Sequence, residues 1–383
     1  MVSTLIRVTG DWSLAEDCTA EAFEAALSTW ERDGIPRNKG AWLTTVAKNR
    51  ALDRLRRAAV LDRKLEEVAS VSELEHLDPE LPDFPDDRLR LIFTCCHPAL
   101  PLEARVALTL RTVAGLTTEQ IARAFLVPEA TVAQRIVRAK RKITQAGIPY
   151  RAPSPDLLPE RLPGVLAVLY LAFNEGYTTR SEVADEAIRV TRSLAQLMPD
   201  EPEVLGLLAL MLLQHSRRHA RLQNGELLTL EEQDRSLWDA AAIAEAGALL
   251  GRPSRPGRYR LQAAIAAVHA SAPTADATDW PTLVALYDQL LLVAPTPVVS
   301  LNRAIAVGMD RGSDAGLAAL DAVAGSLGSY PFLPAARADL LRRSGRVDEA
   351  AEQYAVALAA ASGDAERRAL QRALDGLPRD GIV

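Results

Sequence analysis

The 383-residue chain has little of what supports disulfide bonding, membrane insertion or export. Its three cysteines are too few in so long a chain for a disulfide framework, which predicts a reducing compartment. No run approaches the roughly 18 apolar residues of a membrane helix, since the longest candidate, Val204–Leu213, is interrupted by Gly206. The N-terminus has neither the charged start nor the long apolar stretch of a signal peptide. These absences predict a soluble, cytoplasmic protein with no membrane partner.

Sequence fingerprints of enzymes and metal sites are also missing. The chain has no nucleophile elbow, no phosphate-binding loop and no dinucleotide-binding glycine pattern. Cys95, Cys96 and His97 are adjacent, so they cannot all face one ion on a helix, and no CxxC or HxxxH pair completes a ligand set. Free cysteines near a helical core are the better interpretation. We therefore expect no catalytic residue, no metal, no cofactor and no enzymatic activity.

Alternating strand patterns are scarce, whereas helical periodicity runs through almost the whole chain. Apolar residues make up 48% of the sequence, enough to bury large cores. We therefore predict an all-α protein. One predicted helical stripe, capped by Asp11 or Ser13, consists of Leu14, Cys18, Phe23, Leu27 and Trp30.

Two proline-rich stretches are predicted to divide the chain. Residues 61–88 are acidic and show no sustained apolar stripe, and residues 147–163 read as a second linker. The predicted helical domains are therefore residues 1–60, 89–146 and 164–383.

The net charge of −6 hides a strong local difference. Residues 58–88 hold three basic and ten acidic residues, whereas residues 89–146 hold nine basic and three acidic ones. The whole-chain value argues against a nucleic-acid binder. The basic block at residues 89–146, which lies between acidic segments, instead favours nucleic-acid binding by that part of the chain.

Residues 116–143 carry the strongest local pattern, two short helices joined by a turn. Thr117 and Gln120 form a predicted capping box for the first helix, and Pro128 starts the second, where its missing N–H costs nothing. The second helix has an apolar stripe of Val132, Ile136, Ala139 and Ile143. Its outer face combines side chains that can reach base edges with cations that can neutralise phosphates. The predicted DNA-binding residues are Glu129, Thr131, Gln134, Arg135, Arg138, Arg141 and Lys142. A solvated basic helix in a bundle is the alternative.

With this motif in place, the chain resembles the bacterial extracytoplasmic-function (ECF) sigma factors of RNA polymerase. Within that family it looks like the subgroup whose long C-terminal extension carries tetratricopeptide-like repeats. Asp11–Trp30 and Gly40–Arg57 resemble the polymerase-docking and promoter-melting parts of sigma region two, and Pro101–Ile143 resembles region four. Blocks that resemble the extension are Asn174–Tyr177, Gln233–Asp239, Leu261–Ala270 and Pro297–Val307.

The resemblance implies that region two docks on the β′ clamp helices of core polymerase through a helix with an acidic face. The implied polymerase-binding residues are Glu16, Asp17, Glu21 and Glu24. Asp17 and Glu21 match acidic positions of the family, but Ala20 stands where glutamine is usual. The clamp contact is therefore expected to be weaker or differently distributed. A solvated helix face is the alternative for these acids.

The same resemblance assigns melting of the minus-ten element to the turn at Asp33–Lys39 and the helix after it. The implied residues are Arg37, Asn38, Trp42, Asn49, Arg50, Arg54 and Arg57. Arg37 and Asn38 could hold a flipped base. Arg50, Arg54 and Arg57 recur at i, i+4 and i+7, a stripe suited to binding the phosphates of one strand. Trp42 either stacks on a base or belongs to the core. Region four would read the minus-thirty-five element.

The C-terminal extension is expected to modulate activity. Residues 335–359 predict two helices with a glycine at the bend, as in a tetratricopeptide unit, although an ordinary helical hairpin fits equally. Upstream, a basic cluster from His215 to Arg221 is followed by acids at Glu231, Glu232 and Asp239. These charges predict either a salt-bridged surface between helices or a ligand pocket.

The implied partners are core polymerase, through the β′ clamp helices and the β flap, promoter DNA, and a protein or ligand of the extension. Family members usually carry another helix before the segment that here begins at Met1, so we expect the first helix of region two to be missing. Two other classes stay open: a helix-turn-helix regulator that is no sigma subunit, and a tetratricopeptide scaffold.

Overall fold

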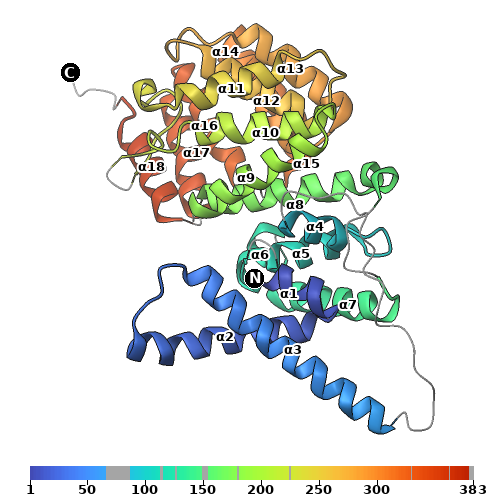
Figure 1. Ribbon diagram of the computed structural model, residues 1–383. Coiled ribbons are helices and arrows are strands. Elements are labelled where there is room, and N and C mark those ends of the chain that lie inside the picture. Colours follow the sequence, from blue (N-terminus) through green and yellow to red (C-terminus); the bar gives the residue numbers. More distant parts are fainter. Residues whose placement is uncertain are drawn as a thin grey trace. The chain divides into compact units, whose positions relative to one another are not determined.

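The computed structural model describes residues 1–65, 87–112, 115–125, 127–148, 154–178, 181–223, 226–328, 330–361 and 363–378. These residues are almost all helical (Figure 1), which confirms the predicted all-α class. The strands in this part of the chain are β1 (Leu222–Gln223) and β2 (Glu226–Leu227), which form one antiparallel hairpin. The chain forms two compact units, Met1–Leu197 and Met198–Val383.

The first unit contains nine of the helices. They are α1 (Val2–Thr9), α2 (Trp12–Asp33), α3 (Lys39–Leu65), α4 (Asp87–Cys95), α5 (Leu102–Thr112), α6 (Thr118–Phe125), α7 (Glu129–Gln145), α8 (Leu158–Thr178) and α9 (Ser181–Leu197).

Small residues bring α2 and α3 together. The carboxylate of Asp11 accepts a hydrogen bond from the Leu14 N–H at 3.0 Å, so the predicted cap of α2 is confirmed. Alanine side chains at the crossing let the two helix axes approach closely. The buried alanines are Ala15, Ala22 and Ala26 of α2 and Ala47 and Ala51 of α3.

The predicted apolar stripe of α2 is partly wrong. Cys18 is buried, but the side chains of Phe23 and Leu27 are 52% and 77% exposed. The physical reason is that the alanine face and Trp12 form the contact surface of α2, and the two larger residues lie beside that face.

Both predicted linkers are shorter than expected where the structure describes them. Helix α3 continues to Leu65 and α4 begins at Asp87, while residues 66–86 of the first linker lie outside the described residues. In the second, α8 begins at Leu158 and contains Pro163. Burial of Leu162, Val165 and Leu166 outweighs the backbone hydrogen bond that the proline lacks. Helix α8 packs on α4 and α5 within the first unit.

The second unit is a succession of helices that pack on their neighbours in sequence. They are α10 (Pro202–His215), α11 (Ala240–Leu250), α12 (Arg258–Ser271), α13 (Trp280–Val293), α14 (Pro297–Arg311), α15 (Ser313–Leu327), α16 (Phe332–Arg343), α17 (Val347–Ala360) and α18 (Asp364–Asp375). The predicted helical hairpin at residues 335–359 is α16 and α17, with Gly345 at a φ of 78° in the bend.

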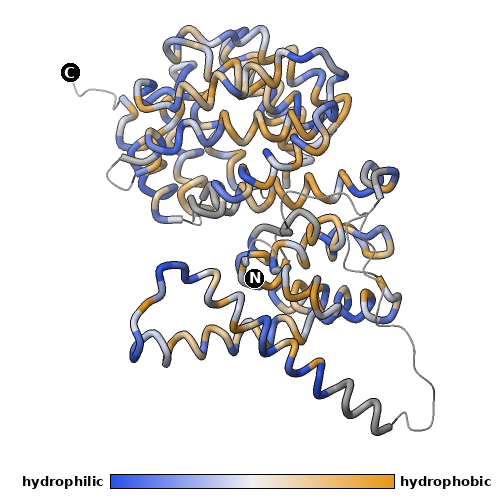
Figure 2. The backbone as a smooth tube through the Cα atoms, in the orientation of Figure 1, coloured by the Kyte–Doolittle hydropathy of each residue, from blue (hydrophilic) through white to orange (hydrophobic). Residues whose placement is uncertain are grey.

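Helix α10 is the central apolar element of this unit. It is hydrophobic nearly all round (Figure 2), as a buried helix must be. Gly206 lets the α12 backbone come close, because a Cβ there would lie 2.6 Å from the Arg260 nitrogen. The Glu203 carboxylate accepts hydrogen bonds from the Tyr259 and Arg260 N–H groups at 3.0 and 3.2 Å, so α10 caps the start of α12.

Candidate nucleic-acid and polymerase interface

Helices α6 and α7 form the helix-turn-helix predicted from residues 116–143. The Thr117 N–H donates to Gln120 Oε1 at 2.8 Å, and the Gln120 N–H donates to Thr117 Oγ1 at 3.1 Å, which confirms the capping box. Pro128 directly precedes α7, and its carbonyl accepts from the Thr131 N–H at 3.0 Å. The predicted stripe of α7 is also confirmed: its buried residues are Val132, Ile136, Ala139 and Ile143.

The residues predicted to read DNA lie outside the buried stripe of α7. Thr131 and Arg135 are half-buried, and the other five are exposed: Glu129, Gln134, Arg138, Arg141 and Lys142. Sequence reasoning missed Val137, whose side chain is 65% exposed one turn from both Gln134 and Arg141. The sequence signal that could have identified Val137 is an apolar residue that lies outside the buried stripe of α7. A valine in this place can contact a thymine methyl group in the major groove.

A pocket of about 560 Å³ lies between the start of α5 and the C-terminal half of α7. Leu100, Pro101 and Ala104 supply apolar lining from the α5 side. Cations of α7 line the other side: Arg135, Arg138, Arg141 and Lys142. The basic surface of α7 therefore continues into a partly apolar hollow.

The side chains predicted to melt the promoter lie along the start and middle of α3. Those at residues 37, 38, 49, 54 and 57 are exposed, and Arg50 is half-buried. Asn38 Oδ1 accepts a hydrogen bond from the Ala41 N–H at 3.0 Å, so this side chain caps α3. The Trp42 ring meets the Trp30 ring edge to face at 5.5 Å, which uses part of its surface in packing.

Two of the acids predicted to bind polymerase pair with two of the arginines predicted to bind DNA. Glu21 of α2 accepts from Arg50 of α3 at 3.0 Å and from Arg54 at shorter range. Asp17 lies 3.7 Å from the Arg54 guanidinium. These pairs join sites that the sequence assigns to two different partners.

Glu16 pairs with α7 instead. Lys140 Nζ of α7 lies 2.7 and 2.8 Å from the two carboxylate oxygens of Glu16. The buried Trp12 donates its Nε1–H to Glu16 at 3.0 Å, and the Lys140 ammonium lies 5.6 Å from the Trp12 ring centre. A carboxylate, an indole ring and an ammonium therefore form one contact between α2 and α7.

The cysteines pack in cores. Cys18, Cys95 and Cys96 are buried, and desolvation raises the pKa of Cys96 to about 12, so this thiol stays protonated at neutral pH. Within the described residues, no group of three or more histidines, cysteines and acids is placed to hold a metal ion. Nor does any helix there combine the length and apolarity that crossing a bilayer requires.

Family models match three parts of the chain. Residues 1–60 match sigma-70 region 2, residues 90–143 match sigma-70 region 4, and residues 161–254 match a family of unknown function (DUF6596). An uncharacterized protein of Rhizobium meliloti (strain 1021) is 42% identical over 393 residues, which cover 98% of this chain and 93% of that protein. No solved structure matches the chain.

These findings agree with the geometry of α6, α7 and the charged faces of α2 and α3. Sigma factor families are non-enzymatic transcription regulators whose partners are core RNA polymerase and promoter DNA. The chain belongs to the ECF-like sigma factors that carry a C-terminal extension.

Proposed function

We propose that this sigma factor opens the minus-ten element with α3 and the loop before it, and reads the minus-thirty-five element with α7. The observation that carries the proposal is the outer face of α7. It presents Gln134 and Val137 for base edges and exposed cations for the backbone, on a helix whose opposite face is fully packed. Because polymerase is its partner, we place the protein in the cytoplasm.

For the minus-ten element, the segment that leads into α3 supplies polar side chains, and α3 itself supplies a basic stripe. Arg37 and Asn38 are exposed at the entrance, and Arg54 and Arg57 are exposed one turn apart further along the helix. Exposed guanidinium groups at this spacing can follow the phosphates of one separated strand. Binding of a flipped base in the loop would then offset part of the energy of strand separation.

For polymerase, we propose that the docking surface of α2 combines carboxylates with apolar contact. Phe23 and Leu27 are exposed one turn apart on α2, and Glu24 is exposed next to Phe23. Such a pair can supply the apolar anchor of an interface with the β′ clamp helices, with the acids at its rim. In this proposal the apolar residues, and not the four acids alone, contribute to the binding energy of the interface.

We propose that the β flap contacts the start of α5, where Leu100, Pro101 and Ala104 line the apolar side of the pocket beside Glu103, and that the α7 cations are left to promoter DNA. The second unit, with α8 and α9 before it, would modulate activity through a protein partner or ligand. Its tetratricopeptide-like character stays a prediction.

The test is in vitro transcription with core RNA polymerase on a genomic DNA library, read out by sequencing the transcripts. The full chain should produce a defined set of start sites that core enzyme alone does not. An R138E/R141E variant should lose them, whereas R252A should keep them, because Arg252 lies in the second unit, where it pairs with the exposed Asp200. DNA binding without polymerase association or transcripts would favour the helix-turn-helix regulator instead.

A further inference from the structure

We propose that the pocket between α5 and α7 binds a small amphipathic anion, a molecule with an aliphatic body and one phosphate or carboxylate head group. The ligand is neither polymerase nor DNA, so its binding goes beyond the proposed function, and only its effect on promoter binding rests on that function. Three features of the pocket support such a ligand: its size, its aliphatic side and its cations.

The pocket has the size of a ligand site. Its volume of about 560 Å³ lies within the range of roughly 300–1,000 Å³ that is usual for small-molecule sites. Ala99, Ala104 and Ala139 are among the residues that line it, and the last two are buried. Short side chains where α5 and α7 pack leave a hollow that longer ones would fill. The hollow is therefore built into the packing of the two helices.

The apolar side of the pocket favours an aliphatic body over a nucleobase. Leu100, Pro101 and Ala104 line it, and Leu100 is only 2% exposed. No aromatic ring stands among the described residues of the lining. Proteins that hold a single base commonly stack it on an aromatic side chain. An alkyl or acyl chain needs apolar contact only.

The polar side of the pocket is one face of α7. Residues at i, i+3, i+7 and i+10 line it, which is the spacing of a single helix face. They form the pocket stripe: Arg135, Arg138, Lys142 and Gln145. Gln134 and Val137, which are proposed to contact base edges, lie roughly 90° away round the helix at about 100° per residue. Helix α7 therefore presents different stripes to bases and to the pocket.

The charge of the pocket selects an anion. Arg135, Arg138, Arg141 and Lys142 line it against one acid, Glu103, and none of these cations has an ion pair within the described residues. Guanidinium groups bind phosphate and carboxylate through paired hydrogen bonds, which gain strength beside apolar surface. Glu103 opposes a ligand with several negative charges, so one head group fits better than several.

A bound ligand would compete with promoter DNA and with the β flap. Its head group would hold Arg138 and Lys142, and its chain would cover Leu100 and Ala104. The same occupancy would therefore weaken both contacts that the proposed function gives to region four.

Isothermal titration calorimetry of the full chain with octyl phosphate, below its micelle-forming concentration, tests the site. Octyl phosphate should bind as one molecule per chain. Octyl glucoside has the same chain without charge, and inorganic phosphate has no chain, so each should bind about tenfold more weakly or worse. Equal affinity for octyl phosphate and octyl glucoside would overturn the proposal.

Two variants locate the site. R138Q/K142Q removes two cations of the pocket stripe, and A99L fills the hollow from an exposed position, so each should weaken octyl phosphate binding about tenfold. The matched control, R252Q/R255Q, removes the same charge from exposed positions of the second unit and should bind like wild type. Equal losses in the two double variants would mean attraction by net charge alone and would overturn the site.

Vesicles distinguish a free ligand from a lipid surface. The full chain should bind octyl phosphate in solution and should not float with vesicles of phosphatidylglycerol. Flotation with these vesicles, together with no binding of octyl phosphate, would overturn the proposal of a free ligand.

Fluorescence anisotropy with a duplex of about 40 base pairs measures the competition. At constant ionic strength, saturating octyl phosphate should weaken duplex binding by wild type about threefold and leave R138Q/K142Q unaffected. An unchanged affinity of wild type would contradict the competition.

Calorimetry needs neither polymerase nor promoter, so it separates this inference from the proposed function. Run-off transcripts from wild type without octyl phosphate binding would refute only the ligand site. Binding of octyl phosphate without transcripts would refute only the sigma role.

Discussion

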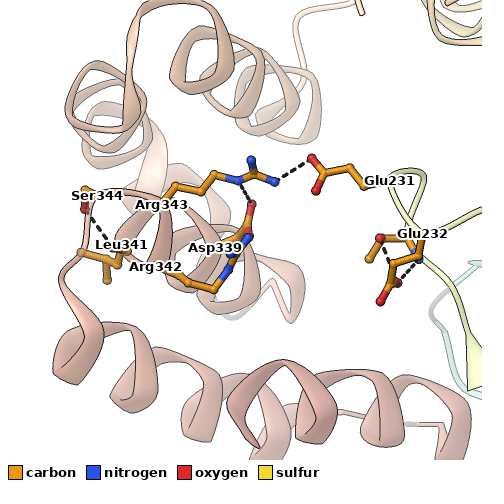
Figure 3. A network of polar contacts seen from close by, with 8 residues as sticks. Glu231, Glu232, Asp339, Leu341, Arg342, Arg343 and Ser344 are labelled. Carbon is orange, nitrogen blue, oxygen red and sulfur yellow. Dashed lines mark hydrogen bonds and ion pairs between the residues drawn. The ribbon is translucent and has the colours of Figure 1, made fainter. Parts of the chain in front are cut away.

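Ion pairs serve different purposes in the two units. In the first unit they join acids of α2 that are predicted to bind polymerase to Arg50 and Arg54 of α3, which are predicted to bind DNA, and to Lys140 of α7. In the second unit they join a connecting segment to distant helices. Glu231 accepts from Arg343 at 2.6 Å across 112 residues of sequence, and Arg372 contacts Glu226 and, at 3.4 Å, Glu232 (Figure 3 shows Arg343 between Glu231 and Asp339).

The difference lies in what surrounds each pair. In the second unit the segment is also tied by uncharged bonds, such as Gln233 Nε2 to the Leu228 carbonyl at 3.1 Å. Burial opposes ionisation of Glu232, but hydrogen bonds from Thr229 and the charge of Arg372 lower its pKa overall. On α2, by contrast, the Glu21 carboxylate pairs with the side chains of two arginines of α3. The ion pairs of the second unit therefore stabilise the fold, whereas those of α2 in the first unit can exchange partners.

Charge reversal on α7 should have the largest effect. R138E/R141E should weaken promoter binding about a thousandfold at low salt, since two phosphate contacts become repulsive. Both side chains are exposed, so thermal unfolding should stay unchanged. An R343E/R372E variant should show the reverse pattern, with reduced stability and unaltered DNA affinity. Equal loss of DNA affinity in the two variants would remove the distinction between the units.

Acid should weaken the second unit through His269. Burial, with the charges of Arg217 and Arg235, lowers the pKa of His269 to about 4 from its ordinary value near 6.5. The unfolded chain binds the proton first, so stability present above pH 6.5 falls as pH drops to about 4 and levels off below it. The loss is about 3 kcal/mol. Urea unfolding between pH 7 and 4 measures it.

The control for this prediction is H269F, which should flatten that part of the pH profile. His269 contacts Trp280 edge to face at 5.6 Å, so an aromatic replacement keeps the ring packing. A profile that falls equally in H269F would assign the acid sensitivity to other groups.

Local patterns were readable from the sequence, and long-range pairings were not. The capping box at Thr117 and the buried stripe of α7 depend on residues three or four apart, and both were confirmed. The Phe23–Leu27 stripe failed because alanines, weak signals in a hydrophobic pattern, form the actual contact face of α2. Pro163 indicated a linker, but tertiary burial of α8 overrode that local signal.

The site shows the same limit. Each charged set was found from its own helix, but the Glu21–Arg50 and Glu16–Lys140 pairs bridge 29 and 124 residues. Nothing in one helix pattern indicates which opposite charge it will meet. The acids Glu231 and Glu232 were expected near the His215–Arg221 cluster, where Asp239 pairs with Arg218 at 3.4 Å. Their partners lie on α16 and α18.

Removal of the Arg372 ion pairs in the second unit should lower stability by a moderate amount. R372A deletes contacts to Glu226, to Glu232 and to the Leu227 carbonyl, and leaves two acids near each other. We expect a loss of about 1–1.5 kcal/mol in the free energy of unfolding, because the groups are partly exposed. Urea titration followed by circular dichroism measures it. R311A is the matched control, since the exposed Arg311 pairs with its sequence neighbour Asp310 and its loss should change stability by less than about 0.5 kcal/mol.

The smallest effects should come from single neutral substitutions that compare the two kinds of pair directly. E231Q and E21Q each remove one carboxylate from a partly exposed ion pair, so each should lower the free energy of unfolding by only about 0.5 kcal/mol. DNA binding should separate them, because only E21Q frees arginines on a DNA-binding helix. A loss above about 2 kcal/mol in E21Q would mean that the pairs of Glu21 with Arg50 and Arg54 stabilise the fold. The pairs of α2 would then have the same role as the Glu231 pair in the second unit.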